Sequence, residues 1–210
     1  MLVSLEIVPL FRSKEEAKVA KAGYDPARLP PGQYLTEKWP VLHAGTVPDV
    51  DLATWTLEVS GEVERPLSLT REQLLELPSR ELTVDIHCVT RWSRFDTRFK
   101  GVHWSEIAKL VSPRPGARFA VAHAEQGFTA NVPYSALEEE TSLIAYEADG
   151  EPLTADHGGP VRLMIPTRYF WKSAKWLTGI ELLDHDEPGF WERYGYHNDA
   201  DPWEEERYGF

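Results

Sequence analysis

The chain contains a single cysteine, Cys88, which lies where an alternating strand pattern ends and a basic segment begins. A lone thiol cannot form a disulfide within the chain, and it cannot supply a four-cysteine zinc or iron–sulfur site. Three roles remain: an inert core residue, a nucleophile, or one thiolate ligand to a metal whose other ligands come from a cofactor. The rest of the sequence favours the third role.

Two cationic segments accompany this cysteine. The first cationic segment, residues 88–100, contains Arg91, Arg94, Arg98 and Lys100 against one acid, Asp96. The second cationic segment, residues 157–178, has no acidic residue and contains Arg162, Arg168, Lys172 and Lys175. Charge runs are commonly solvated faces, but both of these are interleaved with aromatic residues. In an acidic protein they indicate a local anion site.

The second cationic segment has the residue types of a phosphate site. Gly158 and Gly159 allow a ligand to approach the backbone closely. Arg162 offers a planar fork of donors that suits phosphate, while Ser173 adds a hydroxyl and Lys175 a point charge. The segment is not a P-loop, because the Gly-x-x-x-x-Gly-Lys-Ser/Thr spacing is absent.

Composition restricts the class of protein. The 210 residues, 42% hydrophobic and 27% charged, fit one soluble domain whose core needs no disulfides. The net charge of −12 argues against nucleic acid as the main partner. No stretch approaches the length of a membrane span, and Met1 to Phe11 carries no basic leader. One free cysteine fits a reducing compartment, so we expect a cytoplasmic protein.

The hydrophobic pattern predicts many short strands and few helices, which is typical of an α+β fold with mixed sheets. The predicted helices are 14–22, a short helix after an N-cap at Thr70, and 103–111. The predicted strands are 55–63, 81–88, 118–124, 128–132, 143–148, 160–166 and 180–183. We expect one domain over 1–210, with an N-terminal extension of about residues 1–30 and an acidic, aromatic C-terminal wrap of about residues 184–210.

Four motifs occur in a specific order: Cys88 with its following tryptophan, His157-Gly-Gly-Pro-Val-Arg162, Lys172-Ser-Ala-Lys175-Trp176, and Tyr194-Gly-Tyr-His-Asn-Asp-Ala-Asp-Pro-Trp203. Together they resemble the molybdopterin-binding domain of the sulfite oxidase family, most closely its small prokaryotic oxidoreductases. The resemblance runs from about Gly32 to Tyr208. It implies a molybdenum ion held by a pterin dithiolene and by one protein cysteine, which maps onto Cys88.

The resemblance also implies contacts with the molybdopterin cofactor. By motif match, His157, Arg162, Ser173 and Lys175 would hold it, with Lys172 as a neighbour. Thr36, Lys38 and His43 fall where the family places cofactor-contacting loops, and His123 is a candidate from spacing alone. Because the pterin ends in a phosphate, the second cationic segment is expected to supply its partners.

The implied reaction is a two-electron oxidation or reduction with oxygen-atom transfer at molybdenum, on a small anionic or S-oxo substrate. Arg91, together with Arg94, would attract an oxyanion, although Arg91 can equally stack on Trp92. Related methionine-sulfoxide reductases have a glutamate two residues after the cysteine, where this chain has Thr90; this departure argues against that specific activity and does not establish sulfite as the substrate. The chain contains no Cys-x-x-Cys-His haem motif, so we expect a separate electron-transfer partner or a small-molecule carrier.

Three other interpretations remain open at this point. Cys88 could act as a nucleophile with His87 as base, although strand alternation puts the two on opposite faces. The chain could be a non-catalytic pterin- or anion-binding module. A zinc site could use Cys88 with three histidines, but no metal-ligand spacing supports it. Those histidines are His43, His87 and His103.

Overall fold

The computed structural model describes residues 13–209. Its strands are β1 (Tyr34–Leu35), β2 (Thr56–Gly61), β3 (Leu67–Thr70), β4 (Ser79–His87), β5 (Trp92–Val102), β6 (Phe119–Ala124), β7 (Thr129–Pro133), β8 (Leu143–Ala148), β9 (Glu151–Pro152), β10 (Arg162–Met164) and β11 (Leu177–Leu183). Its α-helices are α1 (Lys14–Lys21), α2 (Arg71–Glu76), α3 (Trp104–Val111), α4 (Tyr134–Glu138) and α5 (Phe190–Arg193). Short 3₁₀ turns are η1 (Pro26–Arg28), η2 (Glu125–Gly127), η3 (Ala155–His157) and η4 (Phe170–Lys172).

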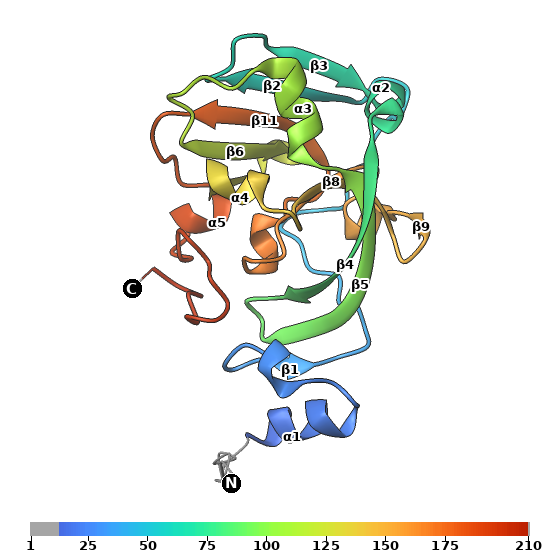
Figure 1. Cartoon of the computed structure of the whole chain (residues 1–210), viewed down its shortest axis with the longest axis vertical. Helices are drawn as coiled ribbons and strands as arrows, with labels where there is room; N and C mark the ends of the chain where they lie inside the picture. Colours follow the sequence, from blue (N-terminus) through green and yellow to red (C-terminus); the bar gives the residue numbers. More distant parts are fainter. Residues whose placement is uncertain (1–12, 210) are drawn as a thin grey trace, which may run out of the picture.

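The strands form two mixed sheets (Figure 1). The larger sheet has the order β1-β5-β8-β10, with β4 paired to β5 and β9 paired to β8. The smaller sheet has the order β3-β2-β11-β6-β7. Each contains one parallel pair, β1 with β5 and β11 with β2, among antiparallel ones. Mixed sheets with short helices confirm the α+β prediction.

Local sequence signals explain where the helices begin. The Ser13 hydroxyl accepts from the Glu16 N–H while the Glu16 carboxylate accepts from the Ser13 N–H, so α1 begins with a reciprocal cap. Thr70 and Gln73 form the same arrangement at α2. His103 caps α3 through its ring nitrogen, which accepts from the Ser105 N–H. All three predicted helices are therefore confirmed, with boundaries within about two residues.

Strand β10 lies between two hydrophobic cores. Val161, Leu163 and Ile165 belong to the core of the five-stranded sheet and helices α2 to α4. Met164 points the other way, into a second core that contains Cys88 and Phe170. The alternation predicted for this strand is confirmed, and it carries the second cationic segment to the wall of the second core.

The longest strand, β5, was not predicted from the sequence. Its outward positions carry charged side chains, and from the sequence residues 88–100 were therefore interpreted as a basic segment and not as a strand. The buried positions Phe95, Thr97 and Phe99 alternate with those charges and provide the strand signal. Figure 1 shows β4 and β5 as a long curved hairpin that reaches down to β1. Cys88 occupies the turn of this hairpin.

The expectation about Met1 to Phe11, and with it the start of the N-terminal extension, lies outside the described residues. Within residues 13–209, no helix combines the length and apolar character needed to cross a bilayer. The cytoplasmic location stays a prediction.

Candidate functional site

The backbone around Cys88 is fixed by hydrogen bonds within its turn and from a distant segment. The Cys88 N–H donates to the Trp92 carbonyl at 2.9 Å, and the Arg91 N–H donates to the Cys88 carbonyl at 2.9 Å. The buried Gln33 amide adds donors to the carbonyls of Cys88 (3.1 Å) and Trp92 (3.0 Å). The turn is therefore held at the two residues that close it.

Arg207 holds the same turn from the C-terminal part of the chain. Its guanidinium is buried and donates to the Val89 carbonyl at 2.8 Å and to the Gln33 side-chain oxygen at 2.9 Å. It also lies over the Tyr169 ring, 4.8 Å from the ring centre. Sequence reasoning missed both Gln33 and Arg207. The one available signal was a lone arginine after three consecutive glutamates.

The Cys88 thiol is 8% exposed and accepts a hydrogen bond from the Thr90 hydroxyl at 3.2 Å. Burial raises the pKa of this thiol, while the Thr90 hydrogen bond and the charges of Arg207 and Lys175 act in the opposite direction. A buried thiol with a single hydroxyl neighbour is a poor solvent nucleophile and a suitable soft ligand.

His87 does not serve as a base for this thiol. Its Nδ1 lies 2.8 Å from the Ser93 hydroxyl, and burial lowers the pKa of His87 to about 4. Across residues 13–209, the described hydrogen-bond partner of the Cys88 sulfur is Thr90 and not a histidine. The nucleophile interpretation therefore gains no support from the geometry.

A cavity of about 490 Å³ adjoins the thiol. Among the predicted site residues, its lining includes Cys88, His43, Arg162, Ser173 and Lys175. Much of the remaining wall is aromatic: Trp39, Trp92, Phe128, Phe170, Trp171, Trp176, Phe190, Trp191 and Tyr196. Residues from three distant parts of the chain thus meet in one concave site, which is the usual form of a cofactor pocket.

Arg162 forms the structural centre of the second cationic segment. Its guanidinium, only 1% exposed, donates to the carbonyls of His157 (2.8 Å) and Ser173 (2.7 Å) and lies 4.2 Å from the Phe170 ring centre. Burial lowers the pKa of Arg162 to about 9, so the side chain remains charged at neutral pH. It supplies positive charge to the cavity wall while joining the two ends of the segment.

Ser173 and Lys175 place polar groups at the same wall. The Ser173 oxygen accepts from the Ile165 N–H at 2.9 Å, which leaves its hydroxyl proton available as a donor. The Lys175 ammonium donates to the Asp156 carbonyl at 2.5 Å. Burial, with Arg162 nearby, lowers the pKa of Lys175 to about 8. Both side chains can therefore serve an anionic group in the cavity.

His157 and Lys172 support the cavity wall from behind instead of lining it. The His157 ring stacks on Trp39 at 4.1 Å, with Nε2 3.3 Å from the Trp39 carbonyl. The Lys172 ammonium is fully buried and bonds to Glu192 at 2.6 Å and to the Asn131 carbonyl at 2.8 Å. Lys172 therefore contacts Glu192 and Asn131 and does not line the cavity.

The remaining predicted residues also lie outside the cavity lining. Thr36 hydrogen-bonds to the Lys38 N–H, and Lys38 is exposed. Arg91 is exposed at a left-handed backbone position, with φ of 77°. Arg94 pairs with Asp149 at 2.6 Å. These four therefore stay predictions as site residues, since the structure places none of them in the cavity lining.

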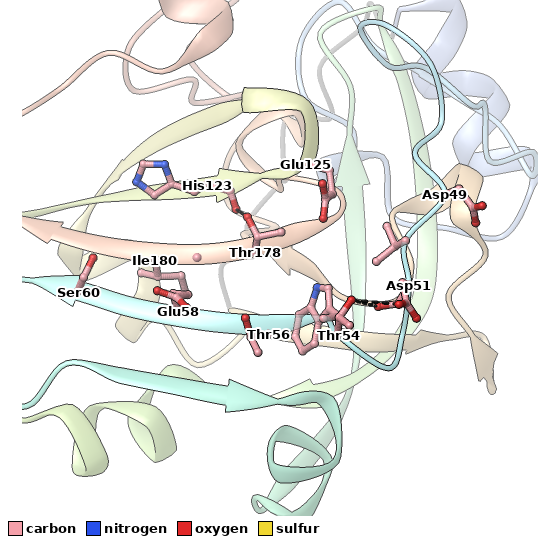
Figure 2. Close-up of a pocket in the computed structure, with 13 residues that line it drawn as sticks. Asp49, Asp51, Thr54, Thr56, Glu58, Ser60, His123, Glu125, Thr178 and Ile180 are labelled. Carbon is pink, nitrogen blue, oxygen red and sulfur yellow. Dashed lines mark hydrogen bonds between the residues drawn. The ribbon is translucent and has the colours of Figure 1, made fainter.

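Another hollow, of about 460 Å³, lies on the five-stranded sheet and has different chemistry (Figure 2). Figure 2 shows His123, Thr178, Glu58 and Ser60 on neighbouring strands, with Asp49, Asp51 and Glu125 at one end. The His123 ring lies 2.9 Å from Glu181. His123 therefore belongs to this carboxylate- and hydroxyl-lined hollow and not to the cavity at Cys88.

The zinc interpretation has no support among residues 13–209. One group there places three metal-ligand atoms within 4.8 Å of one another, and it consists of His197, Asp199 and Glu206. None of the histidines considered for zinc belongs to it. His103, for example, is used as the cap of α3.

The residues of the Cys88 cavity fit a molybdopterin. The indole nitrogen of Trp92, a lining residue only 3% exposed, has no hydrogen-bond partner in the structure. A buried N–H without a partner is costly, and a bound polar heterocycle offers an acceptor. A soft thiol, an unpaired donor and two cations in one cavity match the chemical requirements of such a cofactor.

Comparison with known proteins gives relatives of the same kind. The chain is 47% identical over 182 residues to the uncharacterized oxidoreductase YuiH of Bacillus subtilis, covering 86% of this chain and 92% of that protein. It is 30% identical to the catalytic subunit of the protein-methionine-sulfoxide reductase MsrP of Gluconobacter oxydans, and 28% identical to rat mitochondrial sulfite oxidase. The matches cover 70% and 80% of this chain, but only 54% and 37% of those two proteins.

Among solved structures, the sulfane dehydrogenase SoxCD from Paracoccus pantotrophus shares the fold, with a TM-score of 0.63 at 21% identity. The match covers 73% of this chain and 43% of that one. Residues 44–191 match the family described as the oxidoreductase molybdopterin binding domain, which is more than half of the chain. The chain therefore belongs to this family of molybdopterin-binding oxidoreductases.

Proposed function

We propose that the Cys88 thiolate ligates the molybdenum of the cofactor, and that the enzyme transfers an oxygen atom to or from a small S-oxo substrate. The observation that carries this proposal is the meeting of Cys88, Arg162, Ser173 and Lys175 in one cavity of about 490 Å³. The cysteine is the softest ligand available, and the cationic wall suits the phosphate end of the pterin.

When bound, the cofactor supplies reversible two-electron chemistry. The protein's own residues position and isolate it. Gln33 and Arg207 fix the turn that carries the thiol, so the ligand is held before any metal arrives. Ser173 and Lys175 offer donors to an anion, and the aromatic residues give the rest of the wall an apolar surface.

We infer an uncharged S-oxo compound rather than an oxyanion as the preferred substrate. In the reaction, a thioether and one water would become a sulfoxide, two protons and two electrons, or the reverse. The similarity to a methionine-sulfoxide reductase subunit supports this choice, and the Thr90 at the position of that family's glutamate counts against it. The wall chemistry also supports the choice, because Arg162 is committed to backbone carbonyls and Arg91 lies outside the lining. Sulfite is the second candidate, supported by the sulfite oxidase relatives.

The metal-ligand assignment is tested by Cys88→Ser in protein made by a host that synthesises the pterin. We expect turnover to fall below detection, because a hydroxyl is a poor ligand for a soft metal centre. Molybdenum content and the number of sulfur neighbours from X-ray absorption provide readouts that do not depend on activity. The matched control, Thr90→Val, removes the hydroxyl next to the sulfur and keeps the thiol.

If Cys88→Ser retains wild-type turnover and an unchanged sulfur count, the ligand assignment is wrong. The substrate class is tested separately on the wild-type holoenzyme, by comparing kcat/KM for methionine sulfoxide reduction with kcat/KM for sulfite oxidation. A higher value for sulfite would overturn the inferred preference and leave the metal site unaffected.

A further inference from the structure

The Cys88 sulfur receives its hydrogen bonds from one nearby residue, Thr90. The Thr90 hydroxyl lies 3.2 Å from the sulfur and donates to it. The Thr90 N–H acts in the same direction, and both groups lower the pKa of the thiol because they stabilise the charged sulfur. Across residues 13–209, no other residue is described as a hydrogen-bond donor to this sulfur. Thr90 is therefore the residue through which the protein acts on the sulfur most directly.

The backbone of Thr90 is held on both sides. The carbonyl of Val89, in the peptide group before Thr90, accepts from the buried Arg207 guanidinium at 2.8 Å. The N–H of Arg91, in the peptide group after it, donates to the Cys88 carbonyl at 2.9 Å. Threonine is also β-branched and stiff about its first side-chain bond. The turn therefore fixes the position of the hydroxyl oxygen beside the sulfur.

A structural role in the turn does not account for this hydroxyl. Threonine hydroxyls in turns commonly accept a hydrogen bond from a nearby backbone N–H. In the part of the chain that the structure describes, the hydrogen bond of the Thr90 hydroxyl goes to the sulfur instead. Thr90 is exposed and lines the cavity together with Cys88, so its hydroxyl faces the sulfur where water is an alternative partner. The arrangement serves the sulfur and not the turn.

This hydrogen bond becomes stronger when the sulfur is charged. A neutral thiol is a weak acceptor, whereas hydrogen bonds to ionised groups are roughly twice as strong as those between neutral groups. A sulfur that ligates a metal is a thiolate. Taking the proposed ligation of molybdenum by Cys88 as given, Thr90 then donates to the ligand atom itself. It withdraws part of the negative charge that the sulfur shares with the metal.

Withdrawal of charge from a ligand sulfur has a definite electrochemical direction. Reduction adds an electron to the metal and increases the negative charge on its ligands. A hydrogen-bond donor at the sulfur therefore stabilises the reduced form more than the oxidised form. Hydrogen bonds to ligand sulfurs are one of the means by which proteins set reduction potentials.

We propose that Thr90 is a positioning residue of the metal site, whose hydroxyl donates to the metal-bound Cys88 sulfur and raises the reduction potential of the metal. This inference rests on the proposed function and goes beyond it, because it assigns a residue that sets how readily the site accepts electrons. No covalent bond forms or breaks in this role. The proton stays on the Thr90 oxygen, and the electron that is added or removed belongs to the metal couple.

Thr90→Val and Thr90→Ser separate the hydroxyl from the rest of the side chain. Valine keeps the branched shape and removes the donor, while serine keeps the donor and removes the methyl group. The wild type and both variants are made in a host that synthesises the pterin, and molybdenum content is measured on each sample. The holoenzymes are then titrated with dithionite and ferricyanide, and electron paramagnetic resonance follows the one-electron-reduced metal.

We expect Thr90→Val to lower the reduction potential. At the wild-type midpoint, the ratio of reduced to oxidised metal should fall by about fivefold, the size expected for loss of one hydrogen bond. For a one-electron couple, this ratio corresponds to about 40 mV. Thr90→Ser should change the ratio by less than about twofold. Sulfur K-edge X-ray absorption should show more covalent metal–sulfur bonding in Thr90→Val than in the wild type.

Equal potentials in the wild type and Thr90→Val, at equal molybdenum content, would overturn the role of Thr90 and leave the proposed function standing. Equal decreases in the valine and serine variants would do the same, because they would assign the effect to side-chain packing. Both proposals fail if the wild-type holoenzyme preparation contains no molybdenum, or if Cys88→Ser keeps the wild-type number of sulfur neighbours.

Discussion

The two cationic segments have similar compositions and opposite environments. In the first cationic segment, β5 directs its charges outward: Arg94 pairs with Asp149, and Lys100 lies 3.4 Å from Glu147. In the second, Arg162 and Lys172 are fully buried and bond to backbone carbonyls and to Glu192. The same residue types therefore form a solvated strand face in one place and the frame of a cavity in the other.

This difference shows that the same cationic residue types are surface groups where their partners are exposed acids, and structural groups where their partners are buried carbonyls or a buried carboxylate. The acids that neutralise the first segment lie on β8 and in the turn after it, at the surface of the larger sheet. The second segment has no acid of its own, and its guanidinium and ammonium groups are satisfied by carbonyls and by α5. Mutations of matched residues in the two segments should therefore differ greatly in effect.

The largest effect on stability is expected for Lys172→Ala. This change leaves the Glu192 carboxylate, whose side chain is 3% exposed, without its ion-pair partner. Breaking a buried pair in this way costs about 3–5 kcal/mol. Lys100→Ala is the matched change in the first segment, and it should cost less than about 1 kcal/mol. Urea unfolding of both apo variants measures the difference, and equal midpoints would contradict the contrast between the segments.

A smaller but still large effect is expected for Arg162→Lys. An ammonium keeps the charge but cannot reach both the His157 and Ser173 carbonyls, which Arg162 joins through separate nitrogens. We expect a loss of about 1–3 kcal/mol in unfolding free energy, together with weaker cofactor retention after gel filtration. Arg98→Lys, at an exposed position of β5, is the control. Comparable destabilisation by the two changes would refute the bridging role.

Lys175 gives the cavity a pH dependence. Because the pKa of Lys175 is lowered to about 8, its ammonium is present below that pH and is lost as the pH rises through it. Anion affinity at this wall should therefore decrease between about pH 7 and pH 9, by less than about tenfold because Arg162 stays charged nearby. The negative charges of Asp156 and of the Cys88 thiolate both act to raise the pKa of Lys175, against burial and the charge of Arg162, which lower it.

Inorganic phosphate binding to the apo protein, followed by calorimetry across this range, tests the assignment. Lys175→Arg should flatten the profile, because a guanidinium keeps its proton throughout. A profile for Lys175→Arg that still falls like the wild type would assign the titration to another group.

The smallest effect is expected for Arg94→Ala in the first segment. Its guanidinium bonds to Asp149 and to the Thr97 hydroxyl near the surface. Loss of such an ion pair costs about 0–1 kcal/mol. Molybdenum content and turnover should remain at wild-type values, because Arg94 does not line the cavity. A strong loss of turnover with a normal metal content would contradict this expectation and would support the predicted role of Arg94 in substrate binding.

The sequence by itself determined the local elements. Capping pairs such as Thr70 with Gln73 and alternation such as Val161, Leu163 and Ile165 act over a few residues, so their signals are complete in the chain. It also supplied the solitary cysteine and the motifs that predicted a molybdopterin site, and family membership confirms that cofactor. Strand β5 also carries a complete local signal, because its buried positions alternate with its charged ones, but the same charges are equally typical of a solvated basic segment.

Only the tertiary structure decided which cations reach the cavity and what holds the thiol in place. Gln33 and Arg207 are more than 170 residues apart, yet both fix the turn at Cys88. Lys172 and Arg162 lie ten residues apart, yet one is bound by α5 and the other borders the cavity. The reason is physical: a buried polar group must find partners, and the groups that satisfy it come from whatever distant segment the fold brings beside it.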